Sequence, residues 1–409
     1  TCALRGCDPK KMLIAVSEGV DWAHNLKGKG LEARASVNWA DMIAFKQTFT
    51  DRTPGQIEAE LKKAGITTLH GEARFTGTKT IEFDGKTLRA RHFHIATGAR
   101  PMTLNIPGEQ FLLTSTDFLS LAEKPERIAF VGGGFIAMEF AHLSMRSGAT
   151  EVTVLEMMER PLGNFDPDLV SILVEATEEL GIDLQTNAKV LGIEKNGKEY
   201  AVSYETPTGS KAVVCDLVVH ATGRVPNIDQ LNLSAAKVES GPRGIKVNPY
   251  MRTTNPAIFA AGDCADSGPN LTPVSANEGR VVGKNLLAGK DDRKVVYPPI
   301  PSVVFTLPQV ATVGLSEAAA KEKGLAFDTH FKKTGDWYSS IRVGAKRTAF
   351  KVLVDKESGL ILGAHLIGPG AEEQVNLFAM AMSAGLTANK LKAMIFAYPS
   401  YASDIGSMV

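Results

Sequence analysis

The sequence predicts an α/β fold made of two related α/β domains and a separate α+β domain. Three observations support this prediction. An apolar strand, a run of glycines, a helical stretch and a second apolar strand follow one another between residues 127 and 155. The segment at residues 96–101 is echoed at residues 221–224, which indicates two similar domains. A proline-rich break at residues 298–301 precedes a last set of strands and a helix.

The N-terminal part is expected to be helical first and mostly β afterwards. Residues 10–24 are predicted to form a helix, and residues 39–61 carry apolar side chains at helical spacing. Residues 67–97 change to short alternating runs around Asp84-Gly85, which is a hairpin signal, and end in an apolar strand.

The remaining elements follow in chain order. The β-α-β unit has strands at residues 128–131 and 152–155 with a helix at residues 135–147 between them. A hairpin region then ends in a strand at residues 217–221. Beyond the proline-rich break, strands are expected at residues 302–305, 350–354 and 360–367, and a helix at residues 372–384.

Composition excludes several classes of protein. The 409 residues are enough for two to four domains, each with a substantial core. Lysine plus arginine equals aspartate plus glutamate, at 45 each, so no net charge favours nucleic acid as a partner.

No apolar run approaches the roughly 20 residues that cross a bilayer, so no membrane partner is expected. The 4 cysteines do not make a secreted disulfide scaffold, which favours a cytoplasmic setting. No metal site is expected.

The glycines after the first strand of the β-α-β unit match a dinucleotide-binding fingerprint. Gly132 allows the tight turn, Gly134 lets the backbone approach a pyrophosphate at the helix N-terminus, and Ala137 permits close packing of helix on strand. Glu156 closes the next strand, where it would bind the ribose hydroxyls and repel a 2′-phosphate, so NADH is favoured over NADPH. Arg160 lies close enough to soften that preference. The alternative is a glycine-rich turn in an ordinary β-α-β unit.

A second ligand site is predicted at an apolar strand that ends in Gly262 and Asp263. The backbone can approach a ligand at the glycine, and the carboxylate can accept a hydroxyl hydrogen bond. Thr272 and Pro273 then open a helix whose N-terminus would stabilise negative charge on a reduced flavin. A strand end followed by a chance aspartate is the alternative. The echoed segments add three further candidate cofactor-binding residues, Thr97, Gly98 and Gly223.

The chain opens on two cysteines, Cys2 and Cys7, at the start of a helix. Two thiols in this register can close into a disulfide beside a bound ring system and open when two electrons arrive. Two cysteines near a terminus can equally be idle or buried, so the pair gains weight only from the other motifs.

In order along the chain, these motifs resemble class I pyridine nucleotide-disulfide oxidoreductases, the family of glutathione reductase, dihydrolipoamide dehydrogenase and mercuric reductase. The matching segments are residues 1–11, 96–101, 132–139, 221–227, 262–263 and 363–368. The resemblance implies two Rossmann-like domains, for FAD and NAD(P), and a dimerisation domain. The expected bounds are 1–118 and 244–298 for the FAD-binding domain, 119–243 for the NAD(P)-binding domain and 299–409 for the dimerisation domain.

The family's N-terminal β-α-β unit, which holds the ADP half of FAD, should precede the cysteines by about 40 residues. This sequence starts at Thr1 and does not include that unit. We therefore expect a trimmed chain, and FAD binding is an expectation for the complete protein.

The resemblance also implies a mechanism. Nicotinamide passes hydride to the flavin, and the reduced flavin passes electrons to Cys7, the charge-transfer thiol, which frees Cys2 as the interchange thiol that attacks substrate. Lys10 or Lys11 would pair with Glu139 near the flavin and keep the thiol pKa low. The alternative for these three charged residues is a solvated helix face. Cys215 and Cys264 have no matching role and are expected to be buried small hydrophobic residues.

Tyr398 marks a departure from the disulfide reductases of the family, which carry a His-Pro at this place. That histidine protonates a leaving thiolate, and a tyrosine with a pKa of about 10 is a poor substitute at neutral pH. Mercuric reductases have a tyrosine in this region, but they add a C-terminal cysteine pair, and no cysteine follows Cys264. Packing in a dimer interface is the alternative for Tyr398.

The sequence therefore favours an FAD-dependent NAD(P)H oxidoreductase that works as a homodimer through a redox-active Cys2-Cys7 pair. A small disulfide or other thiol-linked acceptor is expected first. A soft metal ion, a quinone or another electron acceptor is the second choice. A redox-sensing or interaction flavoprotein without turnover remains the alternative of a different class.

Overall fold

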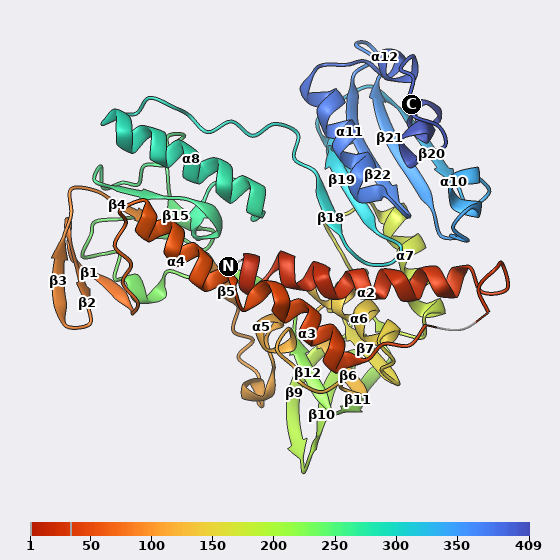
Figure 1. Ribbon diagram of the computed structural model, residues 1–409, viewed down its shortest axis with the longest axis horizontal. Coiled ribbons are helices and arrows are strands. Elements are labelled where there is room, and N and C mark those ends of the chain that lie inside the picture. The colour runs from red at the N-terminus through yellow and green to blue at the C-terminus, as the bar shows by residue number, and fades with distance from the viewer. Residues whose placement is uncertain (1, 33–34) are drawn as a thin grey trace. The chain divides into compact units, whose positions relative to one another are not determined.

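The computed structural model describes residues 2–32 and 35–409, and the chain forms two compact units. The first unit contains Asp51–Thr103 and Gly223–Tyr297 together with the N-terminal residues up to Leu4. The second unit contains Arg5–Thr50, Leu104–Thr222 and Pro298–Val409 (Figure 1). Thr1, at which the expected FAD-binding domain starts, lies outside the described residues.

The second unit contains the predicted β-α-β unit within a four-stranded parallel sheet of order β12-β6-β7-β8. Apart from Arg127, the residues of β6 are fully buried, as expected of a strand covered on both faces. Helix α6 therefore begins at the carboxyl end of a central strand, which is where ligands bind in parallel sheets. The elements are β6 (Arg127–Val131), α6 (Phe135–Arg146), β7 (Glu151–Leu155), α7 (Pro167–Glu179), β8 (Asp183–Gln185) and β12 (Leu217–His220).

A three-stranded antiparallel sheet is inserted between β8 and β12, in the region expected to contain a hairpin. Its inward side chains, among them Ile193, Val202 and Tyr204, pack with Val131 and Leu155 of the parallel sheet. The strands are β9 (Lys189–Asn196), β10 (Glu199–Thr206) and β11 (Gly209–Cys215), and the short helices η1 (Glu109–Phe111) and α5 (Ser115–Phe118) precede β6 in the chain.

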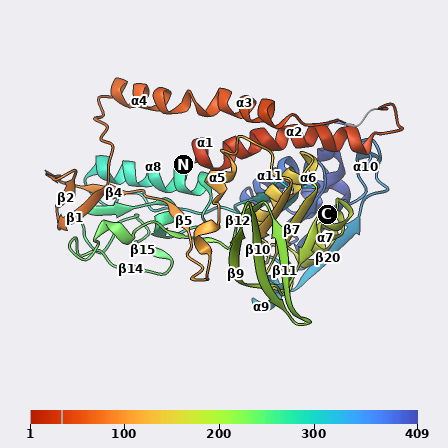
Figure 2. The same ribbon diagram turned by 90° about the horizontal axis from the view of Figure 1, so that it is seen from below.

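The N-terminal helices are longer and more broken than predicted. Helix α2 (Cys7–Asn25) lies alongside α3 (Trp39–Thr50), as Figure 2 shows. The expected helix over residues 39–61 is interrupted at residues 51–52, after which α4 (Thr53–Lys63) belongs to the first unit. The short helix α1 (Cys2–Arg5) precedes α2.

The two units divide the N-terminal part differently from the predicted bounds. Residues 5–50, which lie within the predicted FAD-binding domain, pack in the second unit, and the predicted ligand-binding bounds stay a prediction. The reason is hydrophobic burial, because Leu13 and Met42 join Met138 and Phe140 of α6 in one core. Residues 223–243 were expected in the NAD(P)-binding domain but belong to the first unit.

Short strands make up most of the first unit. The hairpin predicted at Asp84-Gly85 is confirmed: both residues have positive φ, +48° and +72°, as a two-residue hairpin turn requires. Its two longer helices are α4 and α8 (Thr272–Ala288). The strands are β1 (Ala73–Gly77), β2 (Thr80–Phe83), β3 (Lys86–Arg89), β4 (Phe93–Ile95), β5 (Ala99–Pro101), β13 (Arg224–Pro226), β14 (Ser240–Gly241), β15 (Gly244–Lys246), β16 (Ile258–Ala260) and β17 (Ala265–Asp266).

The echoed segments of the sequence pair with each other. Strand β5 follows the first Thr-Gly and runs antiparallel to β13, which follows the second. Arg100 Nε donates to Asp229 Oδ2 at 2.8 Å, and the Arg224 guanidinium donates to the Ala99 carbonyl. The repeat thus marks two points of the chain that meet in one unit.

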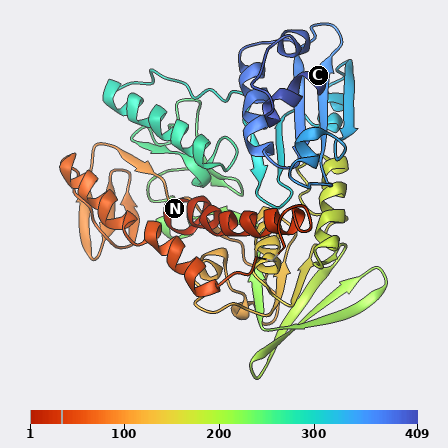
Figure 3. The same cartoon turned by 45° about the vertical axis from the view of Figure 1, so that its right-hand side comes forward.

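A five-stranded antiparallel sheet of order β18-β19-β22-β21-β20 ends the chain. Helix α11 packs against β19 and β22 (Figure 3), burying Val375 and Phe378 with Val352 and Leu366. Sequence periodicity located β18, β21, β22 and α11 but not β19 or β20. The elements are β18 (Ser302–Val304), β19 (Val310–Gly314), α9 (Glu317–Glu322), β20 (Phe327–Lys333), α10 (Tyr338–Ile341), β21 (Ala349–Asp355), β22 (Ile361–Ile367), α11 (Ala371–Ser383), α12 (Ala388–Lys392) and η4 (Tyr401–Ser407). Within the described part of the chain, no helix is both long and apolar enough to span a bilayer.

Candidate active site

The glycine turn before α6 has no side chains that would keep a ligand away from its backbone. Gly132 has φ +101°, and a Cβ atom there would lie 2.6 Å from the Ala221 carbonyl oxygen. Gly134 is the N-cap of α6 and provides no side-chain cap, while Ala137 is fully buried against the sheet. The helix therefore begins with backbone N–H groups that no side chain caps, as a pyrophosphate site requires.

Glu156 lies beside this turn at the end of β7. Its carboxylate accepts hydrogen bonds from the backbone N–H of Gly133 at 2.5 Å and of Met158 at 2.7 Å. The negative charge is thus fixed next to the glycine turn. This arrangement fits a dinucleotide whose ribose carries free hydroxyls and disfavours a 2′-phosphate.

Arg160 is hydrogen-bonded to the backbone of the loop that follows Glu156. Its guanidinium donates to the carbonyls of Leu162, Gly163 and Phe165 at 3.4, 2.8 and 3.1 Å. These bonds fix the guanidinium within its own loop, and its effect on the preference for NADH stays a prediction.

The first unit contains the second predicted ligand site. Gly262 has φ +73°, and the Asp263 carboxylate accepts from the Ser275 hydroxyl at 3.4 Å. Thr272 and Pro273 form the first turn of α8, as predicted. Gly98, in the first echoed segment, also has positive φ, +67°, and follows Thr97. The second echoed segment contributes Gly223, with φ +121°.

Sequence reasoning missed a buried carboxylate beneath the Gly262 turn. Glu278 is 1% exposed and accepts from the backbone N–H of Gly262 at 2.7 Å and of Gly268 at 3.2 Å. The Tyr297 hydroxyl donates to it at 2.6 Å, and burial together with this carboxylate raises the tyrosine pKa. Its only signal in the sequence is an acidic residue within α8. Glu278 holds the turn in shape, so the Gly262-Asp263 pair fits the role of a preformed FAD contact.

The two N-terminal cysteines belong to different units. Cys2 is partly buried in α1, and Cys7 is exposed as the first residue of α2. The N-cap of α2, Gly6, provides no side-chain cap, so the positive end of the helix dipole is available to a thiolate at Cys7.

Lys10, one helical turn after Cys7, forms an ion pair with Glu139 of α6. The Glu139 side chain is 1% exposed, and its other oxygen accepts from the Phe305 backbone N–H at 2.8 Å. Of the two lysines considered from the sequence, Lys10 therefore makes the pair with Glu139. Lys11 instead pairs with Glu18 at 2.5 Å.

A second polar contact holds the other end of α2 on α6. Arg146 donates to the Asp21 carboxylate at 2.7 Å and to the Leu307 carbonyl at 2.9 Å. His142 Nδ1 accepts from the Leu307 backbone N–H at 3.4 Å. Glu139, His142 and Arg146 are spaced to share one face of α6, which we call the α6 polar face. Sequence reasoning singled out Glu139 alone. His142 and Arg146 follow it at helical spacing in an otherwise apolar helix, and this spacing was a signal that they share its face.

His142 is fully buried within the α6 polar face. Its Nε2 contacts the Thr177 hydroxyl at 2.9 Å, and the hydroxyl donates to the Leu173 carbonyl. Burial, reinforced by the charge of Arg146, holds the His142 pKa well below its usual range. The imidazole is therefore neutral at physiological pH.

Tyr398 lies at the surface of the C-terminal domain. It is 79% exposed, and its ring stacks on Tyr338 with centroids 6.5 Å apart. Nearby Asp404 is partly buried, and burial raises its pKa.

The remaining two cysteines are buried, as expected. Burial raises the pKa of Cys215 to about 11. The Cys264 thiol donates to the carbonyls of Ile95 and Ala261 at 3.5 and 3.4 Å. Among residues 2–32 and 35–409, no group of three or more His, Cys, Asp or Glu side chains is arranged to hold a metal ion.

The sequence matches a known protein family along most of its length. Residues 1–279 match the family described as pyridine nucleotide-disulphide oxidoreductase, and residues 300–409 match the dimerisation domain of that family. The chain is 34% identical to a mercuric reductase of Staphylococcus aureus over 400 residues, which are 96% of this chain and 72% of that protein. It is 32% identical to a glutathione reductase of Burkholderia cepacia over 406 residues, 99% of this chain and 89% of that protein.

A further relative and a solved structure extend the comparison. A dihydrolipoyl dehydrogenase of Geobacillus stearothermophilus is 32% identical over 409 residues, 98% of this chain and 86% of that protein. The HOCl-induced flavoprotein disulfide reductase RclA from Escherichia coli has a TM-score of 0.89 at 24% identity. That comparison covers 100% of this chain and 90% of the solved chain, and it establishes the shared fold.

The buried imidazole predicts a loss of stability in mild acid. The unfolded chain protonates His142 below about pH 6.5, whereas the folded chain holds the pKa lower. Below that pH the unfolded state binds a proton that the folded state excludes, so stability falls by up to about 1.4 kcal/mol per pH unit. Urea unfolding of wild type and His142→Asn from about pH 7.5 to pH 5 tests this, because the asparagine does not titrate. An equally steep loss in the variant would contradict the assignment.

The Lys10 ion pair predicts the reactivity of Cys7. The double variant Lys10→Met/Glu139→Gln removes the pair without leaving a buried charge, and it should slow alkylation of reduced Cys7 at pH 7 by about tenfold. The matched control is Lys11→Met, which removes the pair with Glu18 and a cation-π contact with Phe305 but leaves the Lys10–Glu139 pair, and it should change the rate by less than about threefold. Equal effects of both variants would assign the role to charge along α2 in general.

Proposed function

This chain belongs to the pyridine nucleotide-disulphide oxidoreductase family, whose members are enzymes that use FAD and NAD(P)H, and on this premise we propose that it reduces a small disulfide acceptor through Cys2 and Cys7. The overall reaction would be NAD(P)H plus a proton plus a disulfide, giving NAD(P)⁺ and two thiols. Residues 300–409 match the family's dimerisation domain, which supports a homodimer.

The observation that carries the proposal is the Lys10–Glu139 ion pair, which lies one helical turn after Cys7, the first residue of α2. A carboxylate that is 1% exposed needs a permanent partner, so Glu139 holds the Lys10 ammonium in place. Lys10 follows Cys7 by three residues and lies on the same side of α2. This fixed positive charge favours the thiolate form of Cys7, which is the reactive form in disulfide exchange.

The bound cofactors would supply a hydride donor and a two-electron relay to the cysteine pair. For the dinucleotide, the uncapped start of α6 offers backbone N–H groups to the pyrophosphate, and Glu156 faces the ribose hydroxyls. For FAD, the Gly262 turn is held by Glu278 and followed by the first turn of α8. Cys2, in the role of interchange thiol that the family resemblance implies, would attack the acceptor, and Cys7 would then attack the mixed disulfide at Cys2, releasing the second thiol and restoring the Cys2-Cys7 disulfide.

Tyr398 favours a second candidate, the reduction of a soft metal ion. An exposed phenol stacked on Tyr338 is a weak acid, whereas reduction of a thiolate-bound metal ion needs no proton donor. The mercuric reductases among the relatives belong to this chemical class. A disulfide acceptor remains first, because the helix N-terminus and Lys10 favour the thiolate of Cys7 that disulfide exchange needs.

An anaerobic titration of the full-length holoenzyme with NADH tests the proposal. Two electrons should yield two new thiols and a long-wavelength absorbance band from a thiolate beside the oxidised flavin. Cys7→Ser should remove the band and at least about 99% of disulfide reduction, because the electron path is interrupted. Cys215→Ser, which alters a buried thiol, is the control.

Two results would contradict the proposal. If the flavin is reduced while the thiol count stays constant, the cysteines are outside the electron path. If no disulfide and no Hg(II) salt is turned over although both thiols form, a redox-sensing protein without turnover is favoured.

Glu156 predicts the choice of dinucleotide. We expect wild type to prefer NADH, because the fixed carboxylate repels a 2′-phosphate. Glu156→Gln keeps an acceptor for the Gly133 N–H but removes the charge, so kcat/KM for NADPH should rise by about tenfold relative to NADH. Steady-state kinetics with both dinucleotides measures the ratio. An unchanged ratio would show that selectivity lies elsewhere.

A further inference from the structure

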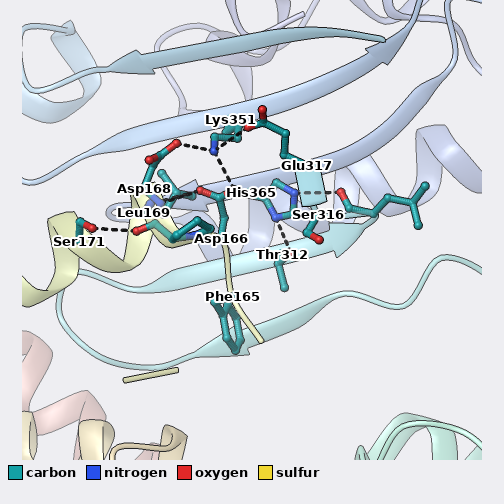
Figure 4. A network of polar contacts seen from close by, with 12 residues as sticks. Phe165, Asp166, Asp168, Leu169, Ser171, Thr312, Ser316, Glu317, Lys351 and His365 are labelled. Carbon is teal, nitrogen blue, oxygen red and sulfur yellow. Dashed lines mark hydrogen bonds and ion pairs between the residues drawn. The ribbon is translucent and has the colours of Figure 1, made fainter. Parts of the chain in front are cut away.

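An ionic cluster centred on the buried Lys351–Asp166 pair joins the C-terminal sheet to the start of α7, in a place that the proposed electron path does not use. Lys351, on β21, is 2% exposed and pairs with Asp166 at 2.9 Å, Asp168 at 2.5 Å and Glu317 at 3.3 Å (Figure 4). Asp166 is 1% exposed. Two of the carboxylates precede or begin α7, and the third begins α9.

The cluster keeps the lysine charged. Burial alone would lower the Lys351 pKa, but the bonds from Asp168 and Asp166 outweigh it and raise the pKa. His365 is also buried here; its Nε2–H donates to the Leu315 carbonyl at 3.1 Å, and its Nδ1 accepts from the Thr312 hydroxyl at 2.6 Å. Burial lowers its pKa, so His365 is neutral and the ammonium is the cation that balances these carboxylates.

Asp166 uses its two oxygens for two different contacts. One accepts from the backbone N–H groups of Asp168 and Leu169, at 3.1 and 3.4 Å, which caps α7. The other accepts from Lys351. Lys351 therefore fixes the carboxylate that starts the helix, and with it the end of the preceding loop.

That loop connects the cluster to the dinucleotide site. It begins at Glu156 and is bonded to the glycine turn, because the Leu162 N–H donates to the Gly133 carbonyl at 3.0 Å. Arg160 donates to the Phe165 carbonyl, directly before Asp166. The glycine turn thus holds one end of the loop, and Lys351 holds the other end through Asp166. Between the two ends, Arg160 is hydrogen-bonded to the loop's own carbonyls.

We propose that Lys351 is a positioning residue for the dinucleotide site, acting from the C-terminal domain through Asp166 and the 156–166 loop. The inference rests on the proposed function, since it takes the glycine turn and Glu156 as the place where NADH binds. It assigns to the C-terminal domain a part in nucleotide binding besides dimerisation.

The same helix offers a matched control. Arg347, also from the C-terminal domain, pairs with Glu175 and Glu179 on the later turns of α7. Glu179 follows Asp166 by 13 residues, which is about 20 Å along a helix. Arg347 therefore joins the same two parts of the second unit without contacting the nucleotide loop.

The experiment measures NAD⁺ affinity of the full-length holoenzyme by isothermal titration calorimetry, together with KM for NADH, kcat and the thermal midpoint. Lys351→Met should weaken NAD⁺ binding and raise KM for NADH by about tenfold, with kcat changed by less than about twofold. Arg347→Met should leave the affinity within about twofold of wild type, although it also removes an ionic contact between these domains.

Asp166→Asn serves as the second variant if Lys351→Met does not fold. Asparagine still caps α7 but loses the charge that pairs with Lys351, so NAD⁺ affinity should again fall by several-fold. Wild-type affinity in every folded variant overturns the inference while leaving the proposed function intact. Equal losses of affinity in Lys351→Met and Arg347→Met also overturn it. Failure of the wild-type holoenzyme to bind either NAD⁺ or NADP⁺ overturns the proposed function itself.

Discussion

The burial of Glu139 is the constraint on which the second unit depends. Taking a carboxylate out of water costs several kcal/mol unless partners replace the solvent. Here the partners are the Lys10 ammonium and the Phe305 N–H, which come from segments at opposite ends of the chain. The charge is satisfied only when both segments lie on α6. Arg146 imposes the same condition on the far end of α2 through Asp21 and Leu307.

The buried ion pairs of the second unit therefore join parts of the chain that are distant in sequence, while apolar packing fills the space between them. Lys351 meets Asp166 in the same manner as Lys10 meets Glu139, with both partners nearly inaccessible to water. Apolar side chains could pack in several registers. A buried charge tolerates few, because a shifted helix would leave it without a partner.

Local patterns in the sequence predicted the elements that are stabilised locally. The Asp84-Gly85 turn and the glycines before α6 have the backbone geometry that their residue types favour. The break between α3 and α4 could not be predicted, since it follows from helices that pack in different units. The roles of Glu278 and Arg146 were missed because tertiary packing, and not a local pattern, brings each side chain to its partner, Gly262 or Leu307.

The shared core of the second unit has a consequence for how the chain is made. Leu13 belongs to the same apolar cluster as Phe130 and Ile367. During synthesis α2 thus emerges long before β22, and the cluster cannot close until nearly the whole chain has left the ribosome. Such distant contacts slow folding and prolong the exposure of apolar surface. The helix that begins with Cys7 is made long before β22, yet its final surroundings are incomplete until β22 has been made.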